Sequence, residues 1–491
     1  MAKKIKLDTN AQLLAWAAEQ GARITHLEIS ESLDCRGAVA VDTIQNNTEI
    51  CFIPSSILLS ESVAMHSEIG KCIREYLGSN EDELRLLTHD DKYMHSIEIV
   101  CMAAFIVYEK NEKQHDSFWF PYLNSLPASY ELPVCWSDAT AERLLKGTAL
   151  GHMTTEKKIW LRNVVQIIGK CTSEYFTNSW NEESFLWAYC TISSRAFPKS
   201  RQEQSNDLNE TQNWITISEI CLYPVLDLLN HRRGHKIEWK MSDEGVSFIS
   251  GEPVMAGTQV FNNYGPKGNE NLLGNYGFVL DDNAENYFKM FLNTADSDPQ
   301  RDCKLSLLNA MTPSGRSYML FADDTDMKPE AIAVTRLLVA NIWELACIHD
   351  KFSNDIHSRS LSIRNEMVTF QTLHSLLAAT LATLKKYAIS ETSNDEYPQL
   401  TRMASIYRNG QISIVEHGIK NCIDKIKELS GSSPESIFFS LRHPIIDPGF
   451  LKQVQDLGFD SDTMLNIMAV KYGAHIGLPI ISPEQRALVL G

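Results

Sequence analysis

Two polar clusters joined by short alternating runs constrain the fold of this chain more than any other feature. The first cluster is Asp-Leu-Leu-Asn-His at residues 227–231, and the second is Asn-Asn-Tyr-Gly at residues 262–265. Between them, runs such as Val-Ser-Phe-Ile at residues 246–249 lie among turn-forming residues, namely Gly251, Pro253 and Gly257. This pattern predicts hairpin strands between the two clusters.

A third element, Tyr-Gly-Phe at residues 276–278, follows the second cluster. The order Asn230-His231, then Tyr264, then Tyr-Gly-Phe resembles the SET-domain protein lysine methyltransferases. More narrowly, it resembles the branch typified by the RuBisCO large-subunit methyltransferase and the fungal ribosomal-protein lysine methyltransferases. The resemblance implies that Tyr264 is catalytic and that the chain threads back to lie beside the Asn-His pair.

The resemblance covers roughly residues 20–430 and implies an α+β fold. A SET-domain β-sheet core is expected at residues 20–282, with a helical insertion at about 60–184. A mostly α-helical, substrate-binding-like C-terminal domain is expected at residues 290–430. Residues 435–491 are expected to form a tail whose role the sequence does not indicate.

The family uses S-adenosyl-L-methionine (AdoMet), so the resemblance implies this cofactor. Arg195, in a Ser-Arg-Ala-Phe segment, is expected to bind the cofactor's carboxylate, because a guanidinium binds carboxylates in a forked geometry. The Asn230 amide is expected at the amino-acid end, and the His231 backbone at the adenine. The full set of implied cofactor residues is Asp34, Cys35, Arg36, Gly37, Arg195, Asp227, Leu228, Leu229, Asn230, His231, Tyr264, Tyr276, Gly277 and Phe278.

Methyl transfer to a lysine explains why a tyrosine hydroxyl and aromatic rings would be needed. A lysine amine has a pKa of about 10.4 and must lose a proton before it attacks. A dry aromatic channel disfavours the charged ammonium and lowers that pKa. The Tyr264 hydroxyl would orient the amine, Gly265 would permit close backbone approach, and Tyr276 and Phe278 would line the cofactor or the lysine channel. Alternatively, all three rings are ordinary strand aromatics.

Other function classes fit parts of the same stretch. His231 and His235, spaced i and i+4, could hold zinc with Asp227 in a hydrolase. A SET-like domain could instead bind proteins without turnover. Within the same family, histidine methylation is a further alternative.

Composition limits the partners and the compartment. The formal net charge of -17 argues against a nucleic-acid binder and favours a basic, non-histone protein substrate, for which ribosomal or translation proteins fit the branch. Eleven cysteines without a Cys-x-x-Cys pair suggest a reducing compartment, the cytoplasm or nucleus. No apolar run is long enough to span a bilayer, so we expect no membrane association.

Periodicity predicts the remaining elements. An amphipathic helix is expected around residues 97–108, a surface loop at 200–213, and a kink at Gly410 within the last helix. The other expected strands lie at residues 39–44 and 49–53, and the other expected helices at 11–20, 331–348, 367–387 and 403–429.

Overall fold

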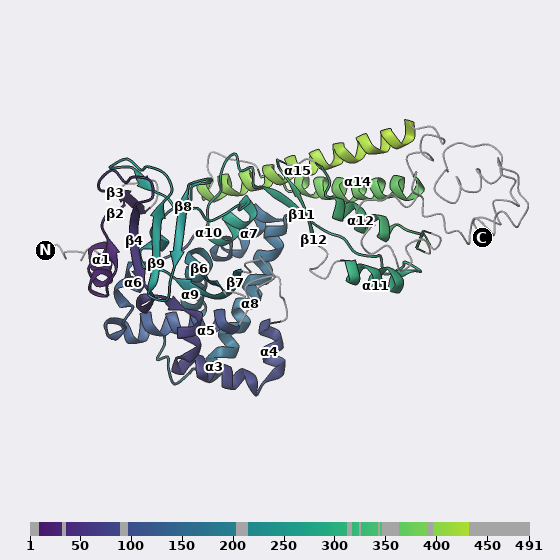
Figure 1. Ribbon diagram of the computed structural model, residues 1–491. Coiled ribbons are helices and arrows are strands. Elements are labelled where there is room, and N and C mark those ends of the chain that lie inside the picture. The colour runs from purple at the N-terminus through teal and green to yellow at the C-terminus, as the bar shows by residue number, and fades with distance from the viewer. Residues whose placement is uncertain are drawn as a thin grey trace, which may run out of the picture. The chain divides into compact units, whose positions relative to one another are not determined.

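The computed structural model describes residues 9–31, 36–88, 97–202, 215–311, 317–323, 326–341, 344–345, 363–389 and 396–431. These residues form two compact units, each with its own core (Figure 1). The N-terminal unit holds the described residues up to 142 together with 150–267 and 271–278. The C-terminal unit holds 143–149, 268–270 and the described residues from 279 onward. The chain therefore passes between the units more than once. The predicted domains each cover one continuous range of residues, and their boundaries stay predictions.

Three small antiparallel sheets form the β part of the N-terminal unit. The four-stranded sheet has the order β1 (Arg23–Ile24), β4 (Glu49–Pro54), β9 (Gly245–Ser250) and β8 (Ile237–Met241). The two three-stranded sheets have the orders β10 (Gln259–Val260), β3 (Gly37–Ala40), β2 (Leu27–Ser30), and β5 (Leu59–Ser60), β7 (Ile215–Leu222), β6 (Ala196–Gln202). The β8–β9 hairpin is the predicted alternation between the two polar clusters, and the α+β class is confirmed.

One strand prediction and one loop prediction differ from the structure in part. The strand expected at residues 39–44 is β3, which starts at Gly37 and ends at Ala40, and Ile44 makes only an isolated bridge to Val254. The loop expected at 200–213 is wrong for residues 200–202, which continue β6 opposite β7. Polar side chains do not prevent a strand when a partner strand satisfies the backbone. Residues 203–214 lie outside the described part.

Helices make up the rest of the N-terminal unit, in the predicted insertion and around it. They are α1 (Thr9–Glu19), α2 (Glu61–His66), α3 (Glu68–Gly78), α4 (Glu81–Thr88), α5 (Ile97–Val107), α6 (Phe120–Ser125), α7 (Asp138–Leu145), α8 (Ala149–Cys171), α9 (Glu182–Arg195) and α10 (Asn269–Tyr276). The last residues of α7 and the first residues of α8 and α10 belong to the C-terminal unit. Side-chain caps start several of them: Ser60 and Ser67 accept backbone N–H groups, and Asn181 with Ser184 forms a capping box.

Helix α5 is the central helix of this unit. Every residue at positions 99–107 is buried, so the prediction of an amphipathic helix is wrong in kind. A helix that is apolar all round lies inside a core, and its few polar residues do not mark a solvent face. Gly70 lets neighbouring helices α2 and α3 meet closely, because a Cβ there would lie 2.1 Å from the Ala64 carbonyl oxygen.

The C-terminal unit is mostly helical, with one short two-stranded antiparallel sheet. Its helices are α11 (Arg301–Met311), α12 (Pro329–Leu338), α14 (Ile363–Lys386) and α15 (Pro398–Gly431), and its strands are β11 (Tyr287–Phe291) and β12 (Ser317–Phe321). The β11–β12 sheet was not predicted, and α12 ends ten residues before the predicted 348. Within α14, Arg364–Lys386 is long and apolar enough to cross a membrane by length and composition alone. Three of its residues, Phe370, Leu373 and Leu377, belong to the core of the unit.

The segment Tyr407-Arg408-Asn409-Gly410-Gln411 anchors α15 in this unit. The buried Arg408 guanidinium donates to the carbonyl oxygens of Leu144 and Lys146, at 3.1 and 2.9 Å. The Tyr407 hydroxyl donates to Glu270 Oε2 at 2.9 Å. The predicted kink at Gly410 is wrong, because α15 runs through it as one helix. The glycine instead makes room for Asn286, whose Nδ2 would lie 3.2 Å from an added Cβ.

Candidate active site

The two polar clusters meet through a parallel bridge between His231 and Asn262. The Asn262 N–H donates to the Asn230 carbonyl oxygen at 2.8 Å, and the Arg232 N–H donates to the Asn262 carbonyl oxygen at 2.9 Å. This geometry turns the N–H and carbonyl of His231 away from Asn262. Neither group has a backbone hydrogen-bond partner within the described ranges.

Three rings are stacked at this junction. The Tyr264 ring lies 5.0 Å from the His231 ring and 5.0 Å from the Tyr276 ring, with interplanar angles of 23° and 26°. Phe278 packs against two of them, 6.3 Å from Tyr276 and 6.4 Å from His231. The structure therefore brings the Asn-His pair, the predicted catalytic tyrosine and the Tyr-Gly-Phe element into one cluster.

Two hydrogen bonds hold Tyr264 in place. Its hydroxyl donates to the Leu229 carbonyl oxygen at 3.0 Å, and its backbone N–H donates to His231 Nδ1 at 3.0 Å. Burial, and then the charge of Lys267, lower the pKa of His231. A neutral imidazole is the form that can accept at Nδ1. His231 therefore positions Tyr264, and its Nδ1 is not available as a base.

Unusual backbone conformations occur where the site turns. Val225 has φ 76° and ψ -47°, a strained conformation for a β-branched residue, immediately before the short turn Leu226–Leu228. Gly265 and Gly277 have φ values of 86° and 81°. An added Cβ at Gly265 would meet no atom within 4 Å apart from those of its two chain neighbours. The glycine is needed because its positive φ turns the chain beside the Tyr264 ring.

Arg195 forms an internal ion pair at the end of α9. Its Nη1 lies 3.1 Å from Asp227 Oδ2 and also donates to the Asp227 carbonyl oxygen at 3.0 Å. The Tyr122 hydroxyl donates to the same Oδ2 at 3.0 Å. The Asp227 side chain has no exposed surface and that of Arg195 is 16% exposed. Burial raises the pKa of Asp227, and the charge of Arg195 opposes that rise.

Some of the predicted cofactor residues support the site with buried side chains, and others connect the segments that form it. Leu228 and Leu229 are buried, and the Asp227 carboxylate lies behind Arg195, so their side chains support the site from within. Asn230 Nδ2 donates to the Arg36 carbonyl oxygen at 3.2 Å, which ties the predicted cofactor loop to the first cluster. Gly37 starts β3 beside it. Asp34 and Cys35 lie outside the described residues.

The sequence interpretation missed several residues of this site. Tyr122, whose hydroxyl donates to Asp227, is not among the residues that the sequence predicted for the site. Phe197 lies 6.2 Å from the Tyr264 ring and 5.0 Å from Trp239. Its place directly after Ser-Arg-Ala was a usable signal, whereas Trp239 on β8 had none.

Asn275, next to the Tyr276 ring, is held by two helices of the same unit. Lys157 Nζ on α8 donates to Asn275 Oδ1 at 3.0 Å, and Ser193 Oγ on α9 donates to the same atom at 3.4 Å. Burial lowers the pKa of Lys157. Lys157 and Ser193 therefore position the end of α10, where the Tyr276 ring begins the aromatic cluster.

The zinc alternative finds no support. His235 Nδ1 faces Glu252 Oε1 at 2.6 Å, His231 Nδ1 accepts from Tyr264, and Asp227 faces Arg195. Among the residues that the structure describes, no three His, Cys, Asp or Glu side chains are grouped to hold a metal ion.

Comparisons with known proteins agree with this geometry. A SET domain of LSMT solved with lysine and AdoHcy has a TM-score of 0.68 at 19% identity, covering 92% of this chain and 99% of that one. The chain therefore shares the fold of the LSMT SET-domain structures. The family described as Rubisco LSMT substrate-binding matches residues 295–415 of this chain.

Curated relatives of this chain include protein methyltransferases. The ribosomal lysine N-methyltransferase set10 of Schizosaccharomyces pombe is 23% identical over 439 residues, covering 84% of this chain and 77% of that protein. The actin-histidine N-methyltransferase of Gallus gallus is 21% identical, covering 84% and 68%. Rubisco LSMT bound to AdoMet is a further structural neighbour, with a TM-score of 0.68, 19% identity and coverage of 94% and 99%.

Proposed function

We propose that this SET protein is an AdoMet-dependent protein-lysine N-methyltransferase. Its substrate would be a basic, non-histone protein of the ribosome or translation apparatus, in the cytoplasm or nucleus. The observation that carries the proposal is the placement of Tyr264, stacked between His231 and Tyr276 with its hydroxyl anchored on the Leu229 carbonyl oxygen. The relatives supply the reaction class, since they include lysine and histidine methyltransferases.

The donor set fits AdoMet. The buried Arg195 Nε has no hydrogen-bond partner within the described part of the chain, so the guanidinium retains a donor toward a carboxylate. The N–H and carbonyl of His231, both turned away from Asn262, suit the hydrogen-bonding edge of an adenine. Asn230 offers an amide beside them, and Tyr276 and Phe278 offer ring faces. AdoMet would supply a methyl group on a positively charged sulfur.

The residues of the chain would act by positioning the lysine amine and excluding water. Positioning two reactants in line can supply much of a rate enhancement. The aromatic cluster disfavours a charged ammonium and so lowers the acceptor's pKa toward neutrality. The Tyr264 hydroxyl, held by Leu229, would orient the amine's lone pair. No group in this account needs to act as a dedicated base.

The aromatic lining favours lysine over histidine as the acceptor. Phe197, 6.2 Å from Tyr264, offers an apolar ring against which the aliphatic part of a lysine side chain can pack. An imidazole acceptor would need a polar partner for its second ring nitrogen. The Trp239 N–H is already directed at Asn262 Oδ1, 3.4 Å away. The actin-histidine relatives keep histidine methylation as the second candidate.

A transfer assay tests the proposal. The purified protein is incubated with labelled AdoMet and lysate from cells that lack it, and the labelled protein is identified by mass spectrometry. Hydrolysis then separates methyl-lysine from methyl-histidine. We expect methyl-lysine in a basic protein. Methyl-histidine would reassign the target residue, and AdoMet binding without any labelled protein would indicate a binding module.

A further inference from the structure

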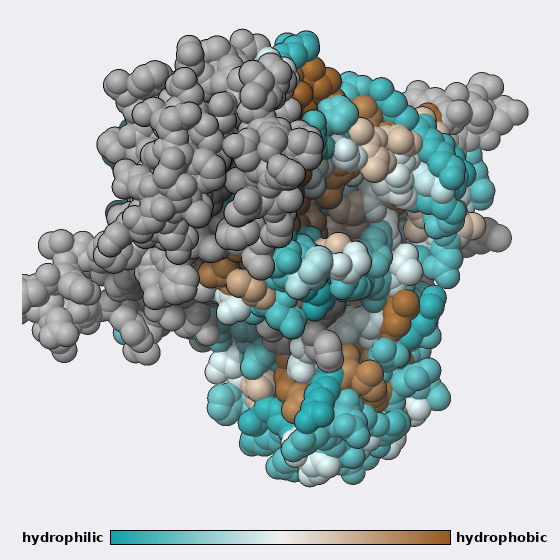
Figure 2. Space-filling view, turned by 90° about the vertical axis from the view of Figure 1, so that its right-hand side faces the viewer, coloured by the Kyte–Doolittle hydropathy of each residue, from teal (hydrophilic) through white to brown (hydrophobic). Residues whose placement is uncertain are grey.

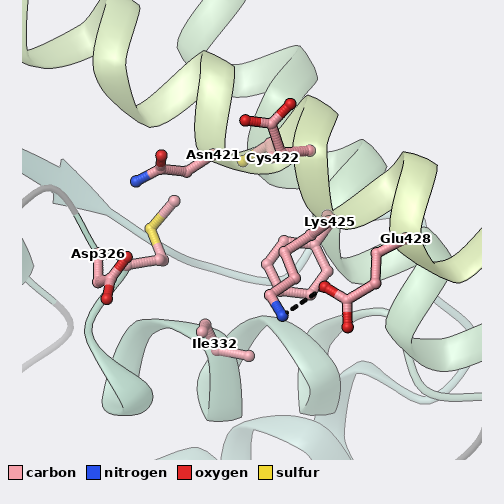
Figure 3. Close-up of a pocket in the computed structure, with 9 residues that line it drawn as sticks. Asp326, Ile332, Asn421, Cys422, Lys425 and Glu428 are labelled. Carbon is pink, nitrogen blue, oxygen red and sulfur yellow. Dashed lines mark hydrogen bonds and ion pairs between the residues drawn. The ribbon is translucent and has the colours of Figure 1, made fainter.

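A pocket in the C-terminal unit contains none of the residues assigned to methyl transfer. It encloses about 390 Å³ and is lined by Asp326, Met327, Ile332, Phe370, Asn421, Cys422, Asp424, Lys425 and Glu428. Figure 3 shows Ile332 pointing into it from one side and Asn421 and Cys422 from the facing helix. Its walls come from the start of α12, from α14 and from the last part of α15. We call it the acidic-rimmed pocket.

The floor of the pocket is the hydrophobic core of the C-terminal unit. Met327, Phe370 and Cys422 belong to that core, with exposed fractions of 8%, 6% and 0%. Ile332 packs against it and is only partly buried. Most of the described surface in Figure 2 is hydrophilic, with apolar residues in separate patches. An opening onto the core is therefore a place where a partner's apolar side chain would lose water contact.

The rim carries more negative than positive charge. Three carboxylates, those of Asp326, Asp424 and Glu428, stand against the one ammonium of Lys425. Lys425 Nζ lies 2.7 Å from Glu428 Oε2, and both side chains are more than half exposed. Such an exposed ion pair contributes at most about 1 kcal/mol, so an incoming cation can replace Lys425 readily. Lys427 lies 3.8 Å from Asp424 and is also exposed.

We propose that the acidic-rimmed pocket docks a segment of the protein substrate in which an aliphatic side chain is flanked by lysine or arginine. The proposal rests on the proposed function, because it names the substrate chemistry that the C-terminal unit recognises. An apolar floor selects the aliphatic residue, and the carboxylates of the rim select its basic neighbours and disfavour acidic ones. The net charge of -17 adds long-range attraction for such a segment.

Peptide binding tests the proposal without methyl transfer. The probe is a short fluorescein-labelled peptide with one leucine between lysines, titrated with the full-length protein without AdoMet. Two control peptides replace the leucine by serine or the lysines by glutamates. We expect the lysine–leucine peptide to bind at least about tenfold more tightly than either control, and to weaken as salt rises. Equal affinity for the three peptides would overturn the proposal.

Matched variants locate the binding. Asp424→Lys with Glu428→Lys reverses two exposed rim charges and is expected to weaken the lysine–leucine peptide by about tenfold or more. The control, Asp243→Lys with Glu244→Lys, makes the same change of net charge in an exposed turn of the N-terminal unit. If both pairs weaken binding equally, net charge alone attracts the peptide and the pocket is not its site. AdoMet affinity, measured separately, reports on the methyltransferase proposal by itself.

Discussion

Replacing Tyr264 by Phe removes one oxygen from the centre of the candidate active site. The ring keeps its place between His231 and Tyr276, because both stacking contacts involve only ring atoms. The hydrogen bond to the Leu229 carbonyl oxygen is lost. If the hydroxyl contributes only to structure, the stability of the protein falls but its turnover does not.

The two expected magnitudes can be separated. Leaving the buried Leu229 carbonyl without this donor costs about 1–3 kcal/mol of unfolding free energy. Losing a positioned polar group at a reaction centre costs about a hundredfold in rate, or about 2.7 kcal/mol of transition-state stabilisation. We therefore expect Tyr264→Phe to remain folded, to bind AdoMet normally and to lose most of its methyl transfer.

The assay combines urea unfolding, calorimetry with AdoMet, and turnover with the substrate from the labelling experiment. Thr154→Val is the matched control, because it removes another buried hydroxyl that donates to a carbonyl oxygen, Leu150, in the same unit. We expect the control to lose stability and keep its turnover. If Tyr264→Phe behaves like the control, with near-normal turnover, Tyr264 is a packing residue and the proposed mechanism is wrong.

Three further predictions follow from buried charges. Arg195→Ala leaves the buried Asp227 carboxylate unpaired and is expected to cost about 3–5 kcal/mol in urea unfolding, so a cofactor-binding defect with unchanged stability would contradict the ion pair. Lys157→Met should lower kcat by about tenfold or more through Asn275, whereas Lys158→Met, whose ammonium pairs with the exposed Asp138, should not. Burial lowers the pKa of Lys110 to about 8. Between about pH 8 and 10 the unfolded chain therefore binds more protons than the folded protein, and the free energy of unfolding rises with pH. Lys110→Met should flatten that rise in unfolding titrations.

Sequence patterns were sufficient to predict local structure and the types of residue that form the candidate site. The alternation between the two clusters predicted the β8–β9 hairpin, and the long helical period predicted α14 and α15. The Asn-His pair, Tyr264 and Tyr-Gly-Phe were identified by type and order, because a positioned hydroxyl and flat rings suit methyl transfer to an amine. The chemistry of a side chain and the pattern of its near neighbours can be read from a short stretch of sequence, so a single sequence was enough to identify them.

Only the tertiary structure showed which residues far apart in the chain contact one another. Nothing local distinguishes an Arg195 that faces a cofactor from one that faces Asp227, and Tyr122, 105 residues away, completes that network. A glycine inside a helix is typical of a kink, but the glycine at position 410 instead makes room for the side chain of Asn286. Periodicity records which face of an element is buried, and it does not record which distant element covers that face. The ion pair behind the site, the three-ring stack and the acidic-rimmed pocket all depend on packing between such elements.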